Sequence, residues 1–527
     1  MKVLVADELS HLGVAALREH HDVDVKTGLT QQELLEVIAA YDAIVIRSAT
    51  TIDAEVIAAA DNLRVIGRAG IGLDNVDIDA ATRAGITVCN APQSNIVSAA
   101  EHTVAMILAL ARNIPQADRA RRVGRGERAR GKGVELHGKV LGIVGLGRIG
   151  VLVAQRCNSF GMRLRAHDPY TTQDRAARMG IELVDDIDEL VASADVLTLH
   201  VPRTPETIDL IDTDRLELMK PTALLVNVAR GGIVDEEALA TALREGQIAG
   251  AAIDVFAEEP VTDSPLFGLD NVVVTPHLGA STREAQDKAG AQIAESVNRA
   301  LAGELVPAAV NVQGGEVDEV VRPFLGLGER LGRLYTALAE GGFGTEITIE
   351  YVGEIAPADG RVLGLSVLKG LLSDVVHEPV TFVNAPLLAE ERGIHIREVS
   401  EPHSEDFVSL VRVHGTDRHG RSIRVAGTVL QPAGRERIVE VWGVPVDLEP
   451  TRYMAFFRYD DRPGIIGRVG TILGEDDVNV AAMQVGRETA GGDAIMVLSL
   501  DQPVPPDVLE RIRGEIDAHE ARAIVLE

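Results

Sequence analysis

The sequence predicts an α/β protein in which two doubly wound parallel sheets are followed by an α+β unit and a small βαββαβ unit. Three observations lead to this prediction. Short apolar runs alternate with helical patterns from residue 1 to about 95, and the same alternation resumes at Val140. From Arg452 onward, the runs and turns follow the order strand, helix, two strands, helix and strand, which is the ferredoxin-like arrangement.

The first unit is expected to form a parallel sheet of the flavodoxin-like kind, because helical segments such as 31–40 separate its apolar runs. A long amphipathic helix over 98–112 then leaves this unit, and the Arg- and Gly-rich stretch 119–132 is expected to be an exposed excursion. The expected strands are 3–6, 22–26, 43–47, 64–68 and 86–89.

The second unit contains six strand-like runs, the number found in a doubly wound dinucleotide-binding (Rossmann) domain. The helical stretch 283–302 is expected to return to the first unit. The first domain would then comprise residues 1–97 and 282–313, with the dinucleotide-binding domain, 98–281, inserted in it. The six expected strands are 140–144, 163–166, 196–200, 223–227, 251–254 and 272–275.

Gly314 and Gly315 mark a linker to the C-terminal part of the chain. Residues 316–450 form a mixed α+β segment without a catalytic constellation, and residues 452–527 form the βαββαβ domain. The expected strands of the last domain begin with 453–459, 479–486 and 494–500, and its helices are 465–473 and 506–518.

Composition excludes several functions. The 51 Lys and Arg residues against 80 Asp and Glu give a net charge of −29, which opposes binding to nucleic acid or to an anionic membrane. An anionic substrate therefore needs a few local arginines. Cys89 and Cys157 are too few for a disulfide framework or a four-thiolate site, and no metal is expected. The sequence shows no secretory signal and no membrane-crossing stretch, which predicts a cytoplasmic protein.

The run GLGRIG at 145–150 is the strongest local signal, because it follows one strand-like run and opens a helical segment. Gly145 permits the tight turn, Gly147 lets the backbone approach a pyrophosphate, and Gly150 allows close packing of helix on strand. Asp168 lies 21 residues after Gly147. A carboxylate there can bind both ribose hydroxyls of NAD and repels the extra phosphate of NADP, so the sequence predicts NAD.

Three chemically useful side chains follow the ends of later strands: Arg230, Glu259 and His277. Open α/β sheets bind their ligands at the carboxyl ends of the strands. Taken singly, each residue is more often structural: a surface arginine, a turn glutamate or a core histidine. Their succession beside a dinucleotide motif favours one catalytic site.

These motifs resemble those of the D-isomer-specific 2-hydroxyacid dehydrogenases. The resemblance rests on the glycine run with Asp168, on Asn-Val-Ala-Arg-Gly-Gly at 227–232 and on Pro-His-Leu-Gly-Ala-Ser-Thr at 276–282. The runs 68–77 and 90–92 also match. The whole chain is similar to the long members of this family, which oxidise 3-phospho-D-glycerate at the start of L-serine biosynthesis.

The resemblance implies that His277 takes the proton of the substrate C2 hydroxyl while Glu259 orients its ring, and that Arg230 holds the substrate carboxylate. Arg47 and Arg68 would bind the phosphate. The implied substrate-binding residues are Arg47, Ser48, Arg68, Gly70, Asn95, Arg230 and His277. The implied NAD-binding residues are Ile71, Gly145, Gly147, Arg148, Ile149, Gly150, Asp168, Val228, Ala229, Arg230, Asp254, His277, Leu278, Gly279 and Ala280.

The last domain resembles an ACT domain, a regulatory module that usually binds amino acids between paired copies. By this resemblance Tyr459, Asp461 and Asn479 would bind L-serine as an effector, the 316–450 domain would serve regulation or assembly, and the protein would be a homo-oligomer, a tetramer. Two alternatives stay open. One is another D-2-hydroxyacid dehydrogenase, such as a glyoxylate or hydroxypyruvate reductase, and the other is a non-enzymatic protein that senses NAD on the same scaffold.

Overall fold

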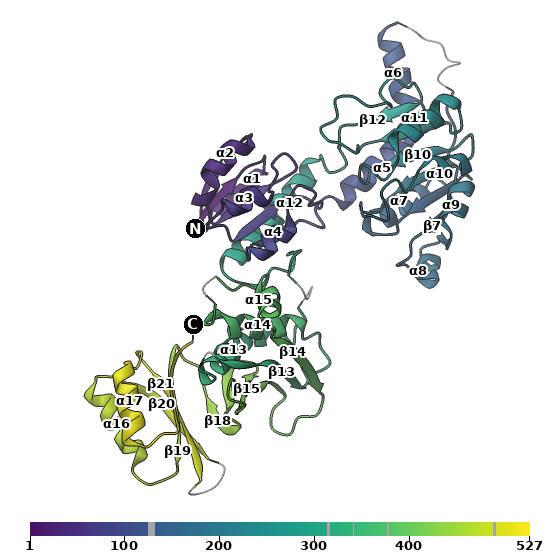
Figure 1. Cartoon of the computed structure of the whole chain (residues 1–527). Coiled ribbons are helices and arrows are strands. Elements are labelled where there is room, and N and C mark those ends of the chain that lie inside the picture. Colours follow the sequence, from purple (N-terminus) through teal and green to yellow (C-terminus); the bar gives the residue numbers. More distant parts are fainter. Residues whose placement is uncertain (125–131, 313–316, 341, 377–378, 488–491, 527) are drawn as a thin grey trace.

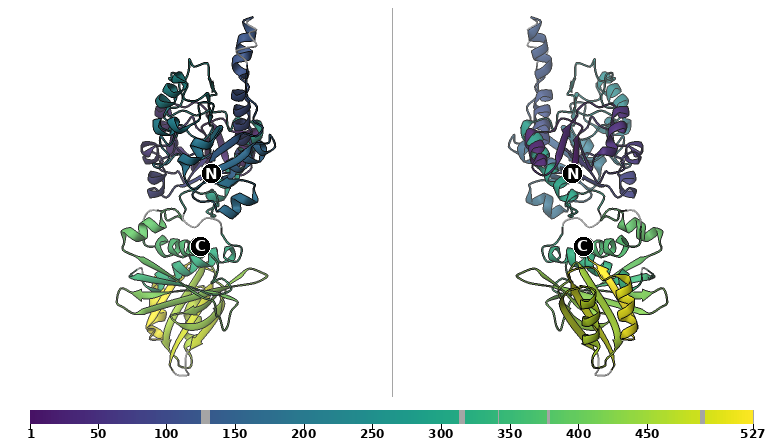
Figure 2. Two further views of the ribbon diagram at one scale, coloured as in Figure 1. Left: turned by 90° about the vertical axis from the view of Figure 1, so that its right-hand side faces the viewer. Right: turned by 90° about the vertical axis from the view of Figure 1, so that its left-hand side faces the viewer.

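The computed structural model describes residues 1–124, 132–312, 317–340, 342–376, 379–487 and 492–526. The expected Gly314-Gly315 linker and half of the expected excursion over 119–132, residues 125–131, lie outside these residues. Figure 1 shows the N-terminal unit between the dinucleotide-binding unit and the C-terminal half of the chain. In the side views of Figure 2 the first two units overlap above the C-terminal half. The predicted fold class is confirmed.

The first sheet has the strand order β2-β1-β3-β4-β5, and all its strands are parallel. Helix α12 (Arg283–Leu301) returns to this sheet: a Cβ built on Gly13 of α1 would lie 2.7 Å from the Gly290 carbonyl oxygen, and Ile293 and Val297 cover Gly67 of β4. The elements are β1 (Lys2–Val5), α1 (His11–Arg18), β2 (Asp22–Val25), α2 (Gln31–Val37), β3 (Ala43–Ile46), α3 (Ala54–Ala58), β4 (Val65–Arg68), α4 (Ile78–Arg83) and β5 (Thr87–Asn90).

The second sheet has seven parallel strands in the order β12-β11-β10-β9-β6-β7-β8, one more than the six expected. The additional edge strand β8 (Glu182–Leu183) has two residues, too few for an apolar pattern to reveal it. The other strands are β6 (Val140–Val144), β7 (Arg163–His167), β9 (Val196–Leu199), β10 (Leu224–Asn227), β11 (Gly250–Ile253) and β12 (Val272–Val274). The helices are α5 (Ile96–Ala111), α6 (Ile114–Arg122), α7 (Arg148–Asn158), α8 (Gln173–Arg178), α9 (Ile187–Ser193), α10 (Thr213–Leu218) and α11 (Glu236–Glu245).

The third sheet, of six strands, has the order β14-β13-β15-β16-β17-β18. Gly332 and Gly370 let α13 and α14 pack with their backbones in contact, since a Cβ on either would lie within 2.1 Å of the other helix. The elements are α13 (Leu325–Leu338), β13 (Phe343–Gly353), α14 (Arg361–Ser373), α15 (Ala385–Glu391), β14 (His395–Glu401), β15 (Ser409–Asp417), β16 (Ser422–Leu430), β17 (Arg435–Val441) and β18 (Val444–Leu448).

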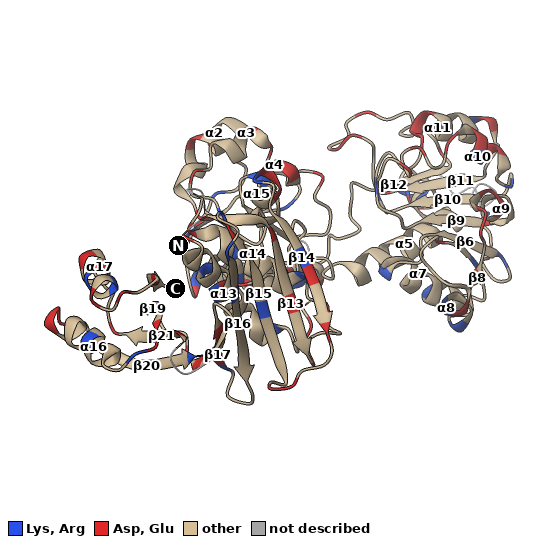
Figure 3. Ribbon diagram, turned by 60° about the horizontal axis from the view of Figure 1, so that its bottom comes forward, with Lys and Arg blue, Asp and Glu red and all other residues tan. Residues whose placement is uncertain are grey.

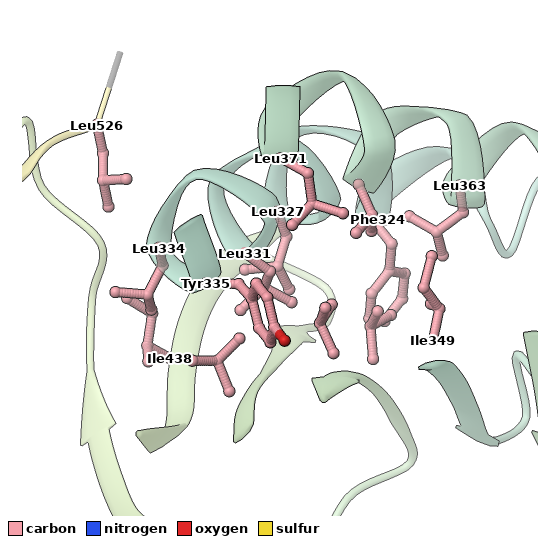
Figure 4. Packing of buried hydrophobic residues seen from close by; sticks show 14 of the residues in the cluster. Phe324, Leu327, Leu331, Leu334, Tyr335, Ile349, Leu363, Leu371, Ile438 and Leu526 are labelled. Atoms are coloured by element: carbon pink, nitrogen blue, oxygen red, sulfur yellow. The ribbon is translucent and has the colours of Figure 1, made fainter. Parts of the chain in front are cut away.

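The last domain has the predicted βαββαβ order and an antiparallel sheet, β20-β21-β19-β22. One sheet face packs on α16 and α17 through residues such as Phe457 and Met496. The other face, including Phe456 and Val497, joins one core with the third domain, part of which Figure 4 shows around Tyr335. The elements are β19 (Tyr453–Asp460), α16 (Ile465–Glu475), β20 (Val480–Arg487), β21 (Asp493–Leu500), α17 (Pro506–Glu515) and β22 (Glu520–Val525). None of the described helices has the length and apolar content that a bilayer crossing requires.

Candidate active site

The glycine turn between β6 and α7 leaves room for a ligand on one side only. Gly145 has φ +95°, and a Cβ on it would lie 2.7 Å from the carbonyl oxygen of His200. A Cβ on Gly150 would lie 2.1 Å from the Gly145 carbonyl oxygen, so the helix packs tightly on the turn. A Cβ on Gly147 would meet nothing within 4 Å, and Gly147 is the N-cap residue of α7, which has no side-chain cap. The open side of this turn fits a pyrophosphate at a helix N-terminus.

Asp168 follows β7 beside this turn. One carboxylate oxygen, Oδ2, accepts a hydrogen bond from the Leu146 amide at 2.7 Å, and Oδ1 accepts one from the Tyr170 amide at 2.8 Å. The carboxylate is therefore held at the glycine turn, with lone pairs left on both oxygens. This geometry fits the binding of a ribose next to the pyrophosphate.

His277 and Glu259 form a hydrogen-bonded pair after β12 and β11. The distance from His277 Nδ1 to Glu259 Oε2 is 2.6 Å, and Glu259 Oε1 accepts the Phe256 amide at 3.0 Å. Burial by itself raises the pKa of Glu259, but the hydrogen bonds from His277 and Phe256 outweigh it, so the pKa lies below the ordinary value. Glu259 is thus an ionised carboxylate that fixes the ring of a half-exposed histidine.

Asp254 holds the backbone of the loop that carries His277. Its side chain is fully buried and accepts the amides of Leu278 and Gly279 at 2.8 and 2.9 Å. His102 of α5 lies 3.1 Å from the same carboxylate, and the Thr275 hydroxyl donates to it at 2.5 Å. His102 and Thr275 were not expected at the site, because neither belongs to one of the motifs. The packing of α5 on β11 and β12 brings His102 to the Asp254 carboxylate.

Arg68 and Arg230 lie on the two sides of the 70–72 turn in the cleft between the first two domains. A Cβ on Gly70 would lie 1.9 Å from Arg68 Nη1, and one on Gly72 would lie 2.9 Å from Arg230 Nη2. Burial, followed by the positive charge of Arg230, lowers the pKa of Arg68 to about 10. Asp74, which the sequence reasoning missed as a site residue, lies 3.7 Å from Arg230 Nε across the cleft. Such a cluster of guanidinium groups favours an anion.

A small cavity of about 20 Å³ adjoins this cluster. Arg47, Gly70, Asn95 and Ala280, all named from the sequence, line it together with Gln286 and Ser94. The side-chain oxygen of Asn95 and the Nε of Arg68 are buried without a hydrogen-bond partner. Buried polar atoms normally have partners, so these two atoms are available to a polar ligand or to water.

The remaining predicted residues are distributed around the cleft. Arg148 Nη1 reaches the carbonyl oxygen of Pro92 at 3.4 Å, which links the two domains. Ser48 is exposed directly after β3, whereas Ile149 packs partly against the core of the second domain. The Ile71 carbonyl accepts Asn90 Nδ2 at 2.7 Å. Four more, Val228, Ala229, Leu278 and Gly279, lie in the neighbouring strand-end loops, where a Cβ on Gly279 would lie 3.2 Å from Val228 Cγ1.

The residues expected to bind serine do not come together within one chain. Asp461 follows β19 and accepts Arg487 Nη1 at 2.8 Å, at the end of the sheet where Arg487 completes β20. Asn479 precedes β20 and donates to Asp501 at 2.5 Å, at the opposite end. The strand between them spans eight residues, about 26 Å at the usual rise. Tyr459 is buried, and burial followed by the charge of Asp461 raises its pKa.

Comparisons with known proteins agree with this geometry. The family model for the D-isomer specific 2-hydroxyacid dehydrogenase NAD-binding domain matches residues 104–279. The models for the D-3-phosphoglycerate dehydrogenase intervening domain and the ACT domain match residues 320–442 and 453–517. Fold and site thus define an NAD-dependent oxidoreductase of the D-isomer-specific 2-hydroxyacid dehydrogenase class, and the predicted cofactor is confirmed.

Relatives that match over nearly the whole chain narrow this class to one family. The D-3-phosphoglycerate dehydrogenase of Mycobacterium leprae is 48% identical over 524 residues, 99% of both chains. That of Synechocystis is 44% identical over 528 residues, 100% of this chain and 95% of the relative. This chain belongs to the D-3-phosphoglycerate dehydrogenase family.

Solved structures match somewhat more than half of the chain. A crystal structure from Thermus thermophilus is 36% identical with a TM-score of 0.55, and covers 59% of this chain and 100% of its own. The NAD-dependent formate dehydrogenase of Staphylococcus aureus in complex with NAD is 32% identical with a TM-score of 0.53, and covers 58% of this chain and 97% of its own.

Proposed function

We propose that this protein oxidises 3-phospho-D-glycerate to 3-phosphohydroxypyruvate with NAD, the first step of L-serine biosynthesis, in the cytoplasm. The observation that carries the proposal is the His277–Glu259 pair in a fold whose adjoining cleft holds three arginines, Arg47, Arg68 and Arg230. Relatives named D-3-phosphoglycerate dehydrogenase at 43–48% identity over nearly the whole chain support this substrate over glyoxylate or hydroxypyruvate.

His277 is the general base of this proposal. Glu259 engages its Nδ1, which assigns the transfer of the C2 hydroxyl proton to Nε2. The ionised carboxylate of Glu259 stabilises the positive charge that the ring then carries. When bound, NAD accepts the hydride that leaves C2.

The arginines supply substrate binding. Arg230 can hold the substrate carboxylate bidentately, since its ion pair with the exposed Asp74 is beyond hydrogen-bond distance at 3.7 Å. Arg47 and Arg68 remain for the phosphate. Figure 3 shows that acidic residues are spread over all domains, in line with the net charge of −29. Because that field repels a trianion at long range, affinity for the substrate depends on these local contacts.

Steady-state rates of NAD reduction test the proposal. We expect kcat/KM for 3-phospho-D-glycerate to exceed that for D-glycerate by at least about tenfold, because one charge-assisted hydrogen bond contributes about 1.5–3 kcal/mol. D-Lactate should react more slowly still. Preference for an unphosphorylated acid would indicate another 2-hydroxyacid dehydrogenase, and NAD binding without turnover of any of the three would indicate a sensor. The enzyme should prefer NAD to NADP, because Asp168 repels the extra phosphate of NADP. Asp168→Ala should reduce this preference for NAD over NADP.

Feedback inhibition by L-serine is part of the same proposal. β20 is an edge strand of its sheet, with Ala481 and Ala482 exposed. Antiparallel pairing of two copies along β20 would bring Asn479 of one copy to the Asp461 end of the other. A serine site between two copies requires a homo-oligomer. The tetramer expected from the family resemblance would contain such paired copies.

Inhibition of the full-length enzyme by serine tests this part. Asp461→Asn and Asn479→Ala should each raise the serine concentration for half-inhibition by at least about tenfold, because each removes a contact with a charged group of serine that contributes about 1.5–3 kcal/mol to binding. Asp507→Asn, an exposed acid on α17, is the matched control. An enzyme that ignores millimolar serine would leave the last domain with an assembly role only.

A further inference from the structure

The loop that carries His277 has a backbone conformation that needs support. His277 has φ +54°, in the left-handed region that costs a non-glycine residue about 1–2 kcal/mol. Three successive amides of the loop donate to one residue, Asp254. The His277 amide reaches its carbonyl oxygen at 2.8 Å, and the next two amides reach its carboxylate at 2.8 and 2.9 Å. The direction of the His277 side chain therefore depends on where this carboxylate is held.

The buried carboxylate of Asp254 is held in turn by a histidine from outside the loop. His102 Nε2 lies 3.1 Å from Asp254 Oδ1 and 3.2 Å from the Thr275 hydroxyl, which itself donates to the carboxylate. Burial by itself raises the pKa of Asp254, and the hydrogen bond from His102 is the largest of the effects that bring it below the ordinary value. Among the described partners of this carboxylate, only His102 comes from outside residues 275–279.

Helix α5 contacts the catalytic loop at a second point on the same face. Ser98, four residues before His102, lies with its hydroxyl 2.7 Å from the hydroxyl of Thr282. The same helix begins after Asn95, which lines the cavity. α5 thus connects the cavity to both ends of the 275–282 loop.

We propose that His102 is a positioning residue of the catalytic loop: through the carboxylate of Asp254 it holds residues 277–279 so that His277 is presented to the substrate. The inference rests on the proposed function in one respect, the role of His277 as general base. If His102 only filled space in the packing of α5, the loop would not depend on the hydrogen bond from its ring nitrogen.

A matched pair of amide substitutions separates these two roles. In His102→Gln the side-chain nitrogen can still reach Asp254, whereas in His102→Asn the side chain is one methylene too short. We expect His102→Asn to lower kcat about 10- to 100-fold, the range for a misplaced catalytic group, and His102→Gln to stay within about threefold of the unchanged enzyme. Glu101→Gln, on the exposed face of the same helix, is the control.

Amide hydrogen exchange gives a readout that does not depend on turnover. Peptides covering 275–282 should exchange faster in His102→Asn than in His102→Gln, while peptides from β6 and β10 should not change in either. In an Asp254→Ala background, His102→Asn should lower kcat by no more than about threefold further, because the interaction that it removes is already lost.

Three results would overturn the proposal: unchanged kcat and exchange in His102→Asn, equal impairment of the Gln and Asn variants, or effects of Asp254→Ala and His102→Asn that multiply in the double variant. Failure of the proposed function has a different signature. The unsubstituted enzyme would then not reduce NAD with 3-phospho-D-glycerate. Hydrogen exchange of the 275–282 loop in the Gln and Asn variants would still test the role of His102 in holding the loop.

Discussion

The cleft between the first two domains and the contact between the last two differ in the side chains that cross them. Polar contacts cross the cleft: Arg230 to Asp74 at 3.7 Å, Arg148 to the Pro92 carbonyl at 3.4 Å, and the hydroxyl pair of Ser98 and Thr282. Apolar contacts join the third and last domains: Phe456, Val497 and Ile524 of the last domain lie in one buried core with residues of the third domain.

This difference predicts different motions. Polar groups at the cleft exchange their partners for water at little net cost, about 0.5–1.5 kcal/mol for each hydrogen bond, so the first two domains can separate to admit substrate. Separating the last two domains exposes apolar area at about 25 cal/mol per Å². We therefore expect the C-terminal half to move as one body and the catalytic half to open and close.

The largest expected effect concerns the cleft. His277→Asn removes the general base, while asparagine tolerates the left-handed backbone at this position. We expect kcat to fall about 10²- to 10⁴-fold with NADH binding retained, measured by steady-state kinetics and by NADH fluorescence titration. The exposed His11 on α1 gives the control His11→Asn. A variant with near-normal kcat would remove His277 from the mechanism.

A substitution in the apolar contact tests the other region. Phe456 is fully buried in the shared core, and Phe456→Ala should cost about 3–5 kcal/mol of stability. Calorimetry should show one transition for the third and last domains together, moved to lower temperature, while the transition of the catalytic half stays in place. Val408→Ala, at a side chain that is 71% exposed, should leave all transitions unchanged. Separate melting of the last domain would contradict a single body.

Arg68→Ala sharpens the account of the cleft. The loss of one charge-assisted contact with the phosphate should weaken the binding of 3-phospho-D-glycerate by about 1.5–3 kcal/mol, which is a roughly 10- to 150-fold rise in Kd. D-Glycerate, which has no phosphate, should be affected much less. Arg64→Ala, at an exposed arginine just before β4, is the matched control. Equal losses for both substrates would mean that Arg68 does not bind the phosphate.

The smallest expected effect is a dependence on pH. The pKa of Glu259 is lowered in the folded protein, so its contribution to stability is complete above the ordinary carboxyl pKa of about 4.3 and is lost as pH falls through the lowered value. The difference in melting temperature between the unchanged protein and Glu259→Gln should therefore be constant from neutral pH to about pH 5 and shrink below it. A difference that grows on acidification would contradict the direction of the shift.

Much of this could be predicted from local sequence. Apolar runs of four or five residues marked the strands of both parallel sheets to within one or two residues, for example Val140–Val144, because such strands are buried on both faces. Arg230, Glu259 and His277 were expected together since strand ends meet at one edge of a sheet, and the structure pairs His277 with Glu259. The two-residue strand β8 gave too little pattern to be found.

By itself, the sequence determined which elements form, where the cofactor turn lies and which chemical groups stand at the strand ends, because these follow from periodicity and spacing along the chain. Only the tertiary structure decided what depends on distant segments. It brought His102 to Asp254, put Asp74 across the cleft from Arg230, and set Asp461 and Asn479 at opposite ends of one sheet. The physical reason is that such contacts depend on how helices and sheets pack, and no local pattern specifies which distant side chains that packing brings within hydrogen-bond reach.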